Sequence, residues 1–530
     1  MEFYASKNDI SMQGIDTILA MPQWYVNYNL RELLEYGTTI EGKSLKDISL
    51  QMQGNNWLTG RVSSLSTSLY VDGSVKKVKF IITFESGTME YYDIYKLPPE
   101  KMQADISGLV FGFLVNLSFE DLVSEEDLPD DVKKQILERM SKLGEGAFTI
   151  QQFFMDLTEA AVSTPDSTIT HYPTGFSDSA KAVFPIYMAT YINGIRSAGG
   201  HVLGYGVKVQ NPGGVDDPVA SYPPTLLEFV TNRYIGYTGQ IQTDLDCILY
   251  LMMTGNNPTF PPNLAPWWGN YVVPGDDVEG VYGCMAMSGG IFVKQFLLSR
   301  LAPIVCTYWE LQNTNNSLDI SSRDAVGQFT PTADGGTWST GQISSLSKKN
   351  NTFSADDAAY NSSFEVTLSI GKGDNKIVIL RTMYFDVEVT HWYGVRDHSI
   401  SSSIHVWYEI PTTITITMDG LDKGALQVNV DVKNKEADPS IAYGDPYGWL
   451  ITKVKGSESI WKEVGDLQER CINDAVNVAV PKGLGTNIKN KIEQSLNLMP
   501  FIFPGGSQLY MKNPAFNYNG DLLVGIQYKG

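Results

Sequence analysis

The residue pattern closest to a catalytic motif is AMSGG, from Ala286 to Gly290. It differs from the G-x-S-x-G nucleophile elbow by the alanine in the first position, and it precedes a helical pattern as an elbow does. Ser288 would then be a nucleophile that needs a carboxylate and a histidine from later residues. The alternative is that Ser288 is the N-cap of the following helix and that the glycines permit close packing. The second interpretation is favoured, because the surrounding strands have antiparallel patterns and the elbow requires a parallel sheet.

Three further patterns were considered for metal or phosphate chemistry. His391, His398 and His405 are spaced by seven, but they lie in a strand-and-turn pattern where odd spacings alternate between faces. The acidic loop PGDDVEG, Pro274 to Gly280, lacks the ligand spacing of an EF-hand. The glycine-containing stretches GKGD and NPGGVDDP do not match a phosphate-binding loop. We therefore predict no metal site, no cofactor and no catalytic residue.

Composition and charge exclude some classes of partner. The chain of 530 residues has a net charge of −20 and 43% apolar residues, as expected of a folded protein with two to four structural units. A surface this acidic repels phosphate backbones, so nucleic acid is not an expected partner, and bulk attraction to anionic membranes is disfavoured. The four cysteines are far apart and fit neither a zinc ribbon nor a dense disulfide framework, so we expect reduced, buried thiols.

No segment has the pattern of a targeting or membrane-spanning element. The N-terminal stretch lacks a positive region followed by an apolar one, so no secretory signal is expected. The longest apolar stretch, Ile106 to Phe119, is too short to span a bilayer as a helix. We expect a soluble protein made in the cytoplasm, which would leave the cell only by a non-classical route.

Helical periodicity is confined to a few segments. In residues 22–37 the apolar residues recur at helical spacing between Pro22 and Gly37. Residues 127–144 have the pattern of a charged surface helix, and residues 457–480 that of the longest helix, followed by another with Thr486 as N-cap. The segment 288–303 is apolar around most of its circumference, which is typical of a helix wrapped by other structure. Its apolar residues are Ile291, Phe292, Val293, Phe296, Leu297, Leu298 and Leu301.

Strand patterns dominate the remainder. Residues 364–370 alternate strictly and begin an antiparallel meander that continues to about residue 432, and residues 76–119 show a looser version. We expect two units, 1–280 with inserted helices and 281–530, with an exposed, mobile loop at Gln312–Ala359. The Ser/Thr-rich alternation in 399–418 is found in pore-forming hairpins, but a sheet with one solvated Thr face is the favoured interpretation. The closing stretch is predicted to be an FPGG turn followed by a strand.

Four short stretches resemble the signatures of a known family. They are GIDTILAMPQWYVNYNL from Gly14, LDCILYLMMT from Leu245, GCMAMSGGIFVKQFLLSRL from Gly283, and FIFPGG…DLLVGIQY from Phe501 to Tyr528. Together they are similar to the clostridial forty-seven-kilodalton and OrfX proteins of botulinum-type and insecticidal toxin gene clusters. The chain departs from that pattern at Ile15, where the family has tryptophan, and in the segment Gln312–Ala359.

The resemblance implies an α+β fold of TULIP type (tubular lipid-binding), with long helices cradled by bent antiparallel sheets and repeated along the chain. It also implies a non-enzymatic accessory or effector protein of a bacterial toxin locus. The expected partner is a lipid or other hydrophobic small molecule, or proteins of the same cluster, and the candidate ligand contacts are Phe292, Phe296 and Leu297. Ordinary core packing of these three residues is the alternative. A directly insecticidal, membrane-active toxin is the second function considered, and a serine hydrolase the third.

Overall fold

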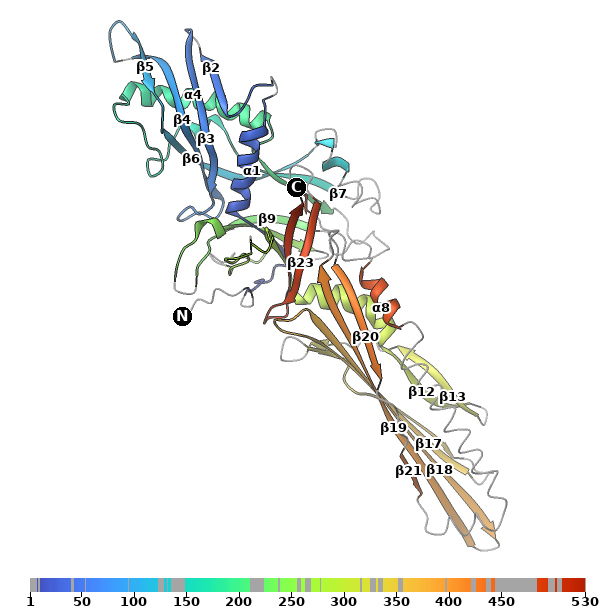
Figure 1. Ribbon diagram of the computed structural model, residues 1–530. Helices are drawn as coiled ribbons and strands as arrows, with labels where there is room; N and C mark the ends of the chain where they lie inside the picture. The colour runs from blue at the N-terminus through green and yellow to red at the C-terminus, as the bar shows by residue number, and fades with distance from the viewer. Residues whose placement is uncertain are drawn as a thin grey trace.

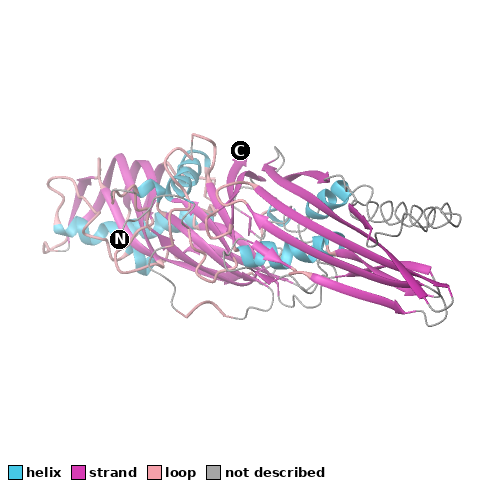
Figure 2. Cartoon of the chain, turned by 90° about the horizontal axis from the view of Figure 1, so that it is seen from below, coloured by secondary structure: helices cyan, strands magenta, loops and turns pink. Residues whose placement is uncertain are grey.

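Three large antiparallel sheets follow one another along an elongated molecule (Figure 1). The computed structural model describes most residues between 7 and 529. The longer segments outside the description are 123–127, 135–147, 210–223, 263–267, 325–329, 332–336, 351–355, 421–425, 435–439, 444–483, 494–500 and 503–507, and gaps of one to four residues occur elsewhere. Strands run along the whole length of the molecule in a second view (Figure 2). The predicted α+β class with antiparallel sheets is confirmed.

The N-terminal sheet has the strand order β2-β3-β4-β6-β7-β8-β22, with β5 paired to β4. Its strands are β2 (Asp47–Met52), β3 (Asn56–Ser68), β4 (Lys77–Asp93), β5 (Glu100–Asp105), β6 (Val110–Asp121), β7 (Phe148–Met155), β8 (Val202–Val209) and β22 (Phe501–Ile502). The helices α1 (Gln23–Tyr36), α3 (Glu159–Val162) and α4 (Asp178–Ser197) accompany it. α1 matches the predicted helix, whereas α4, the longest described helix at 20 residues, was not predicted.

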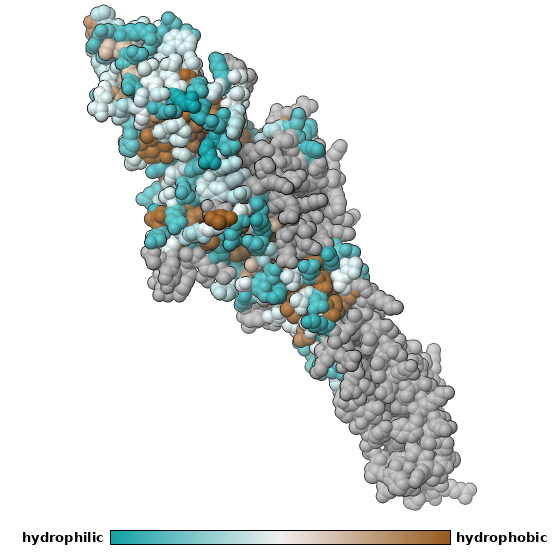
Figure 3. Space-filling model, viewed as in Figure 1, coloured by the Kyte–Doolittle hydropathy of each residue, from teal (hydrophilic) through white to brown (hydrophobic). Residues whose placement is uncertain are grey.

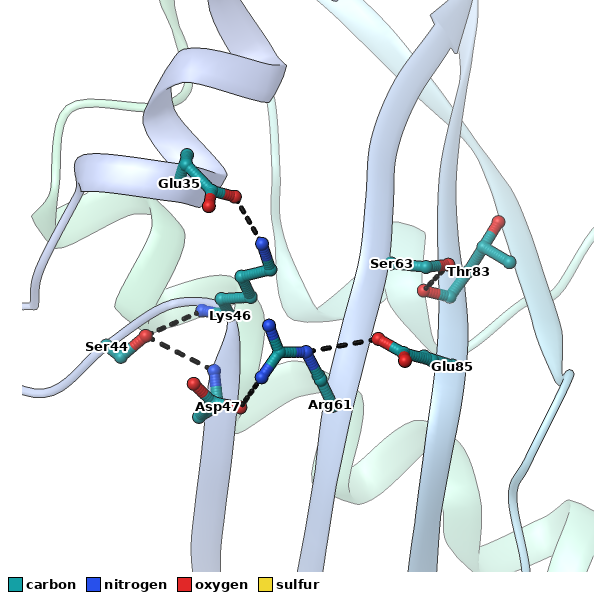
Figure 4. Close-up of polar contacts among 8 residues, drawn as sticks. All are labelled: Glu35, Ser44, Lys46, Asp47, Arg61, Ser63, Thr83 and Glu85. Carbon is teal, nitrogen blue, oxygen red and sulfur yellow. Dashed lines mark hydrogen bonds and ion pairs between the residues drawn. The ribbon is translucent and has the colours of Figure 1, made fainter.

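α1 is joined to the N-terminal sheet at both its middle and its end. The Asn27 side chain accepts hydrogen bonds from the Thr67 backbone N–H (2.7 Å) and hydroxyl (3.0 Å) on β3. Near the C-terminus of α1, Lys46 pairs with Glu35 just before β2 begins (Figure 4). Arg61 then pairs with Asp47 at 3.2 Å and Glu85 at 3.0 Å, which links β2, β3 and β4. These exposed pairs contribute little individually to stability. The Lys46–Glu35 pair joins the end of α1 to the start of β2, and the Arg61 pairs join neighbouring strands.

The central sheet has the order β23-β24-β11-β1-β10-β9 and takes strands from both ends of the chain. The strands are β1 (Thr17–Pro22), β9 (Pro224–Asn232), β10 (Cys247–Thr254), β11 (Gly283–Met287), β23 (Gln508–Phe516) and β24 (Leu522–Lys529), and the 3-10 helix η4 (Thr243–Leu245) precedes β10. Alternate residues of β1, β10 and β11 enter two apolar clusters on opposite faces of the sheet. Burial on both faces explains why these strands are continuous apolar runs.

The C-terminal sheet has the order β14-β15-β17-β18-β19-β20, with β16 on β17 and β21 on β19, and β12 and β13 form a separate pair. The strands are β12 (Thr307–Thr314), β13 (Ser317–Asp324), β14 (Thr330–Pro331), β15 (Thr337–Ser339), β16 (Ile343–Asn350), β17 (Asp356–Ile370), β18 (Lys376–Val395), β19 (His398–Gly420), β20 (Leu426–Asn434) and β21 (Ser440–Tyr443). The expectation of a loop at Gln312–Ala359 was wrong, because most of its described residues are strand. Its Ser/Thr composition suits half-exposed strands as well as loops.

Helical segments of the second half differ from the prediction in type. Residues 290–298 form a π-helix, η5 (Gly290–Leu298), which continues as α5 (Ser299–Val305). α8 (Leu484–Glu493) begins two residues before the predicted N-cap Thr486, and its residues Ile488 and Ile492 are buried. The helix predicted at 457–480, most of that at 127–144 and the FPGG turn lie outside the described residues. The division at residue 280 falls just before β11 and stays a prediction.

Candidate functional site

Ser288 starts the helical segment that carries the predicted ligand contacts. Its hydroxyl accepts a hydrogen bond from the Ile291 N–H at 3.3 Å, and its carbonyl accepts from the Phe292 N–H at 2.8 Å. This is the geometry of a helix N-cap. The Ser288 N–H itself donates to the Asp16 carbonyl at 2.9 Å, so the cap is attached to the residue that precedes β1.

The neighbouring Gly289 is in contact with the loop between β23 and β24. Its N–H donates to the Asp521 carboxylate at 3.0 Å, and a Cβ at this position would lie 2.6 Å from the Gly520 carbonyl oxygen. Real Cβ atoms do not approach an oxygen so closely, so the backbone contact requires glycine here. Asp521 is held in turn by Asn517, and burial raises the pKa of Asp521 above its ordinary value. Gly289 therefore permits the close packing that was predicted for the glycines of this motif.

Two of the three predicted ligand contacts lie fully buried on η5. Phe292 and Leu297 have 0% exposure, while the side chain of Phe296 is outside the described part of the chain. The Phe292 ring lies 5.8 Å from the ring of Phe516 on β23, centroid to centroid, with an interplanar angle of 51°. Phe292 and Leu297 are therefore surrounded by other parts of the protein. Whether they contact a ligand stays a prediction.

The C-terminal interior is defined here as the buried face of β17, β18 and β19 with the helices η5, α5 and α8 that share its apolar cluster. Strand register places its side chains in rows. Leu368, Ile379 and Ile414 form one row, and the next contains Ile370, Ile377 and Ile416. On β19 the intervening residues Thr413, Thr415 and Thr417 are half-buried. In this stretch of β19 the alternation therefore gives one apolar and one partly solvated face, as the favoured interpretation predicted.

One charged residue lies among these apolar rows. Arg381 of β18 is 1% exposed and stands between Val366 of β17 and the buried Thr412 of β19. Its guanidinium carbon lies 5.7 Å from the centre of the Phe364 ring. Burial lowers the pKa of Arg381 to about 10, an effect that Cys306 nearby opposes. Arg381 was not among the predicted site residues, although its position in KIVILRTM, in phase with Ile377 and Ile379, indicated that it faces the interior.

The N-terminal interior is built around α4. The Phe184 ring packs edge-on against Phe111 of β6 at 5.3 Å, and further apolar residues of α4 follow at helical spacing. Two tyrosines reach backbone carbonyls of the sheet region: Tyr187 donates to Glu90 and Tyr191 to Leu45, each at 2.7 Å. Burial raises the pKa of Tyr187 to about 12 and that of Tyr191 further. These hydrogen bonds fix the rotation of α4 on the sheet.

The three histidines considered as metal ligands lie on one hairpin. His391 on β18 pairs with Ser402, and His398 and His405 on β19 pair with Val395 and Glu388. Along the hairpin, the residue pair that contains His391 lies four residues from the pair that contains His398 and three residues from the pair that contains His405. These separations correspond to about 13 and 10 Å. The hairpin itself does not bring these backbone positions together. Among the residues that the structure describes, no group of three potential metal ligands was found.

Comparison with solved structures gave three neighbours that align over nearly the whole chain. P47 from Clostridium botulinum A2 is 11% identical, with 98% of this chain and 99% of that one covered and a TM-score of 0.47. P47 of Clostridium botulinum E1 is 8% identical, with 98% and 100% covered and a TM-score of 0.45. A lipopolysaccharide binding protein is 9% identical, with 97% and 99% covered and a TM-score of 0.32.

The chain thus resembles clostridial P47 proteins, as its motifs predicted. Known family models and curated proteins gave no match to the sequence. Within the part of the chain that the structure describes, no helix is long and apolar enough to cross a bilayer.

Proposed function

We propose that this is a non-enzymatic binding protein of TULIP type, which accommodates the apolar part of a lipid-like molecule between η5 and the C-terminal sheet. The observation that carries the proposal is the π-helical winding of Gly290–Leu298, the segment that contains Phe292, Phe296 and Leu297. π-Helical turns are rare and are frequently associated with functional sites. Here the π-helical conformation extends over nine consecutive residues, whereas it usually occurs as a single turn within an α-helix.

Uptake of a ligand would require movement of η5. Because Phe292 and Leu297 have no exposed surface, an acyl chain must displace them rather than enter beside them. Rewinding from π to α geometry shifts the side chains along the helix and supplies such a movement. The apolar rows of β17, β18 and β19 would then contact the ligand, and each methylene buried there contributes about 0.8 kcal/mol.

The motif resemblance supports an accessory or effector role in a bacterial toxin locus. In that setting the protein binds a lipid-like molecule, partner proteins of the same locus, or both. A directly insecticidal, membrane-active toxin is the alternative from another class. Hydrolysis by Ser288 is the most distant alternative, because its hydroxyl serves as the helix cap and accepts a hydrogen bond from the Ile291 N–H.

Native mass spectrometry of protein purified without detergent tests the binding proposal. We expect a mass above that of the polypeptide, and uptake of a fluorescent fatty acid by protein from which the ligand has been removed. Leu297→Ala should change the affinity for the probe, because it alters the π-helical segment. Leu30→Ala on α1 is the matched control, since it truncates a similarly buried leucine in the other half of the molecule. A bare polypeptide mass without probe uptake would contradict the proposal, and an effect of Leu30→Ala alone would place the ligand in the N-terminal interior.

Two assays separate the alternatives. Dye release from liposomes and an insect feeding assay detect a membrane-active toxin, and we expect neither leakage nor toxicity from the protein alone. Ser288→Ala should retain ligand binding and lower the free energy of unfolding by about 1 kcal/mol through the lost cap. A hydrolytic activity that disappears in this variant would instead identify an enzyme.

A further inference from the structure

Two turns lie together at the end of the N-terminal sheet that is farthest from the central sheet, near the labels β2 and β5 in Figure 1. One joins β2 to β3 and the other joins β4 to β5. The Lys101 ammonium connects them by donating to the Asn55 carbonyl at 3.2 Å. We call this end the apical tip, made of residues 54–57 and 92–101 without residue 94, which is not described.

The apical tip exposes four large apolar or aromatic side chains. Leu97 is 95% exposed, Tyr95 73%, Tyr92 40% and Trp57 36%. Hydrophobic atoms are visible among hydrophilic ones on this end of the surface (Figure 3). Single exposed apolar residues are ordinary on a protein surface, but a group on two joined turns is a feature of interaction sites.

The base of the tip is held in place by α4. The Asp93 carboxylate accepts hydrogen bonds from the Ser179 hydroxyl at 2.5 Å and from the Tyr95 N–H at 3.1 Å. Tyr91 on the same strand shares a hydrogen bond of 2.8 Å with Ser177, the N-cap of α4. The exposed side chains therefore project from a supported turn, and little conformational entropy is lost when they bind.

Both positive charges of the tip are paired with nearby carboxylates. Lys96 pairs with Glu100 at 2.6 Å, and Lys101 with Glu90 at 2.9 Å. The tip carries two positive side chains and two negative ones, Asp93 and Glu100, with Glu90 just outside it, and the whole chain has a net charge of −20. Anionic lipid headgroups would be repelled by the charge of the whole chain, whereas zwitterionic headgroups would not.

We infer that the apical tip contacts the surface of a zwitterionic lipid bilayer, with Leu97 in the acyl boundary and Tyr95, Tyr92 and Trp57 at headgroup level. Tyrosine and tryptophan favour that level of a membrane, and leucine the apolar side of it. A protein partner fits less well, because a stable interface buries about 800 Å² on each side and the tip is a convex end with few side chains. A bilayer can surround such an end.

The test is flotation of the full chain with phosphatidylcholine vesicles. Tyr95→Ser with Leu97→Ser should lower the vesicle partition coefficient more than tenfold, since each apolar side chain withdrawn from water contributes about that factor. The matched control is Tyr36→Ser with Val278→Ser, because these residues are 77% and 86% exposed and lie elsewhere. Tyr36 follows Glu35, whose partner Lys46 lies at the opposite end of β2 from the tip. The control should bind like the parent chain.

Three results would overturn the inference: no binding of the parent chain to phosphatidylcholine vesicles, equal losses in both double variants, or stronger binding to phosphatidylserine vesicles. A second measurement locates the contact. An environment-sensitive fluorophore on Leu97→Cys should shift to shorter wavelength on vesicles, and the same label on Val278→Cys should not. The outcome is independent of the proposed interior site, because the tip variant should still take up a fluorescent fatty acid in the absence of vesicles.

Discussion

Asp16 accepts two hydrogen bonds from Thr254, a residue 238 positions later in the chain: one from the backbone N–H at 2.7 Å and one from the hydroxyl at 3.0 Å. Both residues are buried. The backbone carbonyl of Asp16 also accepts from the Ser288 N–H. One residue therefore connects the start of β1, the end of β10 and the cap of η5. Asp16 thus joins the central sheet to η5, the segment that carries the predicted ligand contacts.

Loss of the Asp16 carboxylate should destabilise the protein substantially. Asp16→Ala leaves the Thr254 N–H and hydroxyl buried without their acceptor, and hydrogen bonds to charged groups contribute about 1.5–3 kcal/mol each. We expect the free energy of unfolding in urea to fall by about 3 kcal/mol. Thr254→Ser retains both donors and is the control, with a loss under about 1.5 kcal/mol. Equal losses in the two variants would show that the hydrogen bonds are not the cause.

Adjacent glycines should respond in opposite ways to the same substitution. Gly289→Ala places a methyl group 2.6 Å from the Gly520 carbonyl oxygen, and neither backbone segment can move freely. Overpacking of this kind costs about 1–3 kcal/mol, and we expect the upper part of that range. At Gly290 a Cβ would meet nothing within 4 Å, so Gly290→Ala should be neutral or stabilise by up to about 1 kcal/mol. Thermal unfolding of both variants measures the difference, and similar midpoints would refute the close contact.

The buried carboxylate of Asp246 should make stability depend on pH. Burial raises the pKa of Asp246 to about 6, although the Tyr234 N–H, which donates at 2.9 Å, and the charge of Arg233 lower it. The folded state thus binds this proton more tightly than the unfolded state, whose pKa is about 3.9. This group's contribution to stability is greatest below pH 4 and decreases as the pH rises to about 6.

Asp246→Asn removes that titration. We expect the stability of the variant relative to the parent chain to rise by about 1–3 kcal/mol between pH 4 and pH 7, measured by urea unfolding at each pH. The difference between the two proteins isolates this group from the other carboxylates. A difference that does not change with pH would mean that Asp246 titrates normally.

The sequence identified the parts of the central sheet but not their arrangement. Its four signature stretches were recognised separately, and the structure assembles them as the neighbouring strands β24, β11, β1 and β10. Strand pairing between residues such as Ala286 and Leu523 depends on contacts across more than two hundred residues, which no local pattern reports. The alternation of β17 to β20 was predictable because one of their faces is solvated.

Other features were missed for specific physical reasons. α4 contains Pro185 and several β-branched and aromatic residues, so its intrinsic helix preference is weak and packing on the sheet decides its conformation. The π-helical winding of η5 has the same residue types as an α-helix and leaves no distinct sequence pattern. The burial of Arg381 breaks the rule that charged residues are exposed, so only its phase within β18 indicated it.

Truncation at the C-terminus should affect the whole molecule rather than one unit. β24 lies between β11 and β23, so it is an interior strand of the central sheet, and Asp521 holds the Gly289 N–H. Deletion of residues 521–530 therefore removes two strand interfaces and the support of the η5 cap. The closing strand was predicted as part of the unit 281–530, but the central sheet contains strands from both halves of the chain. We expect an insoluble protein, or one without cooperative unfolding by calorimetry.

Deletion of Lys529 and Gly530 alone is the control and should shift the midpoint of thermal unfolding by only a few degrees, because Leu522–Tyr528 retain their pairing. A soluble 521–530 deletion with a cooperative transition near that of the parent chain would show that β24 is dispensable.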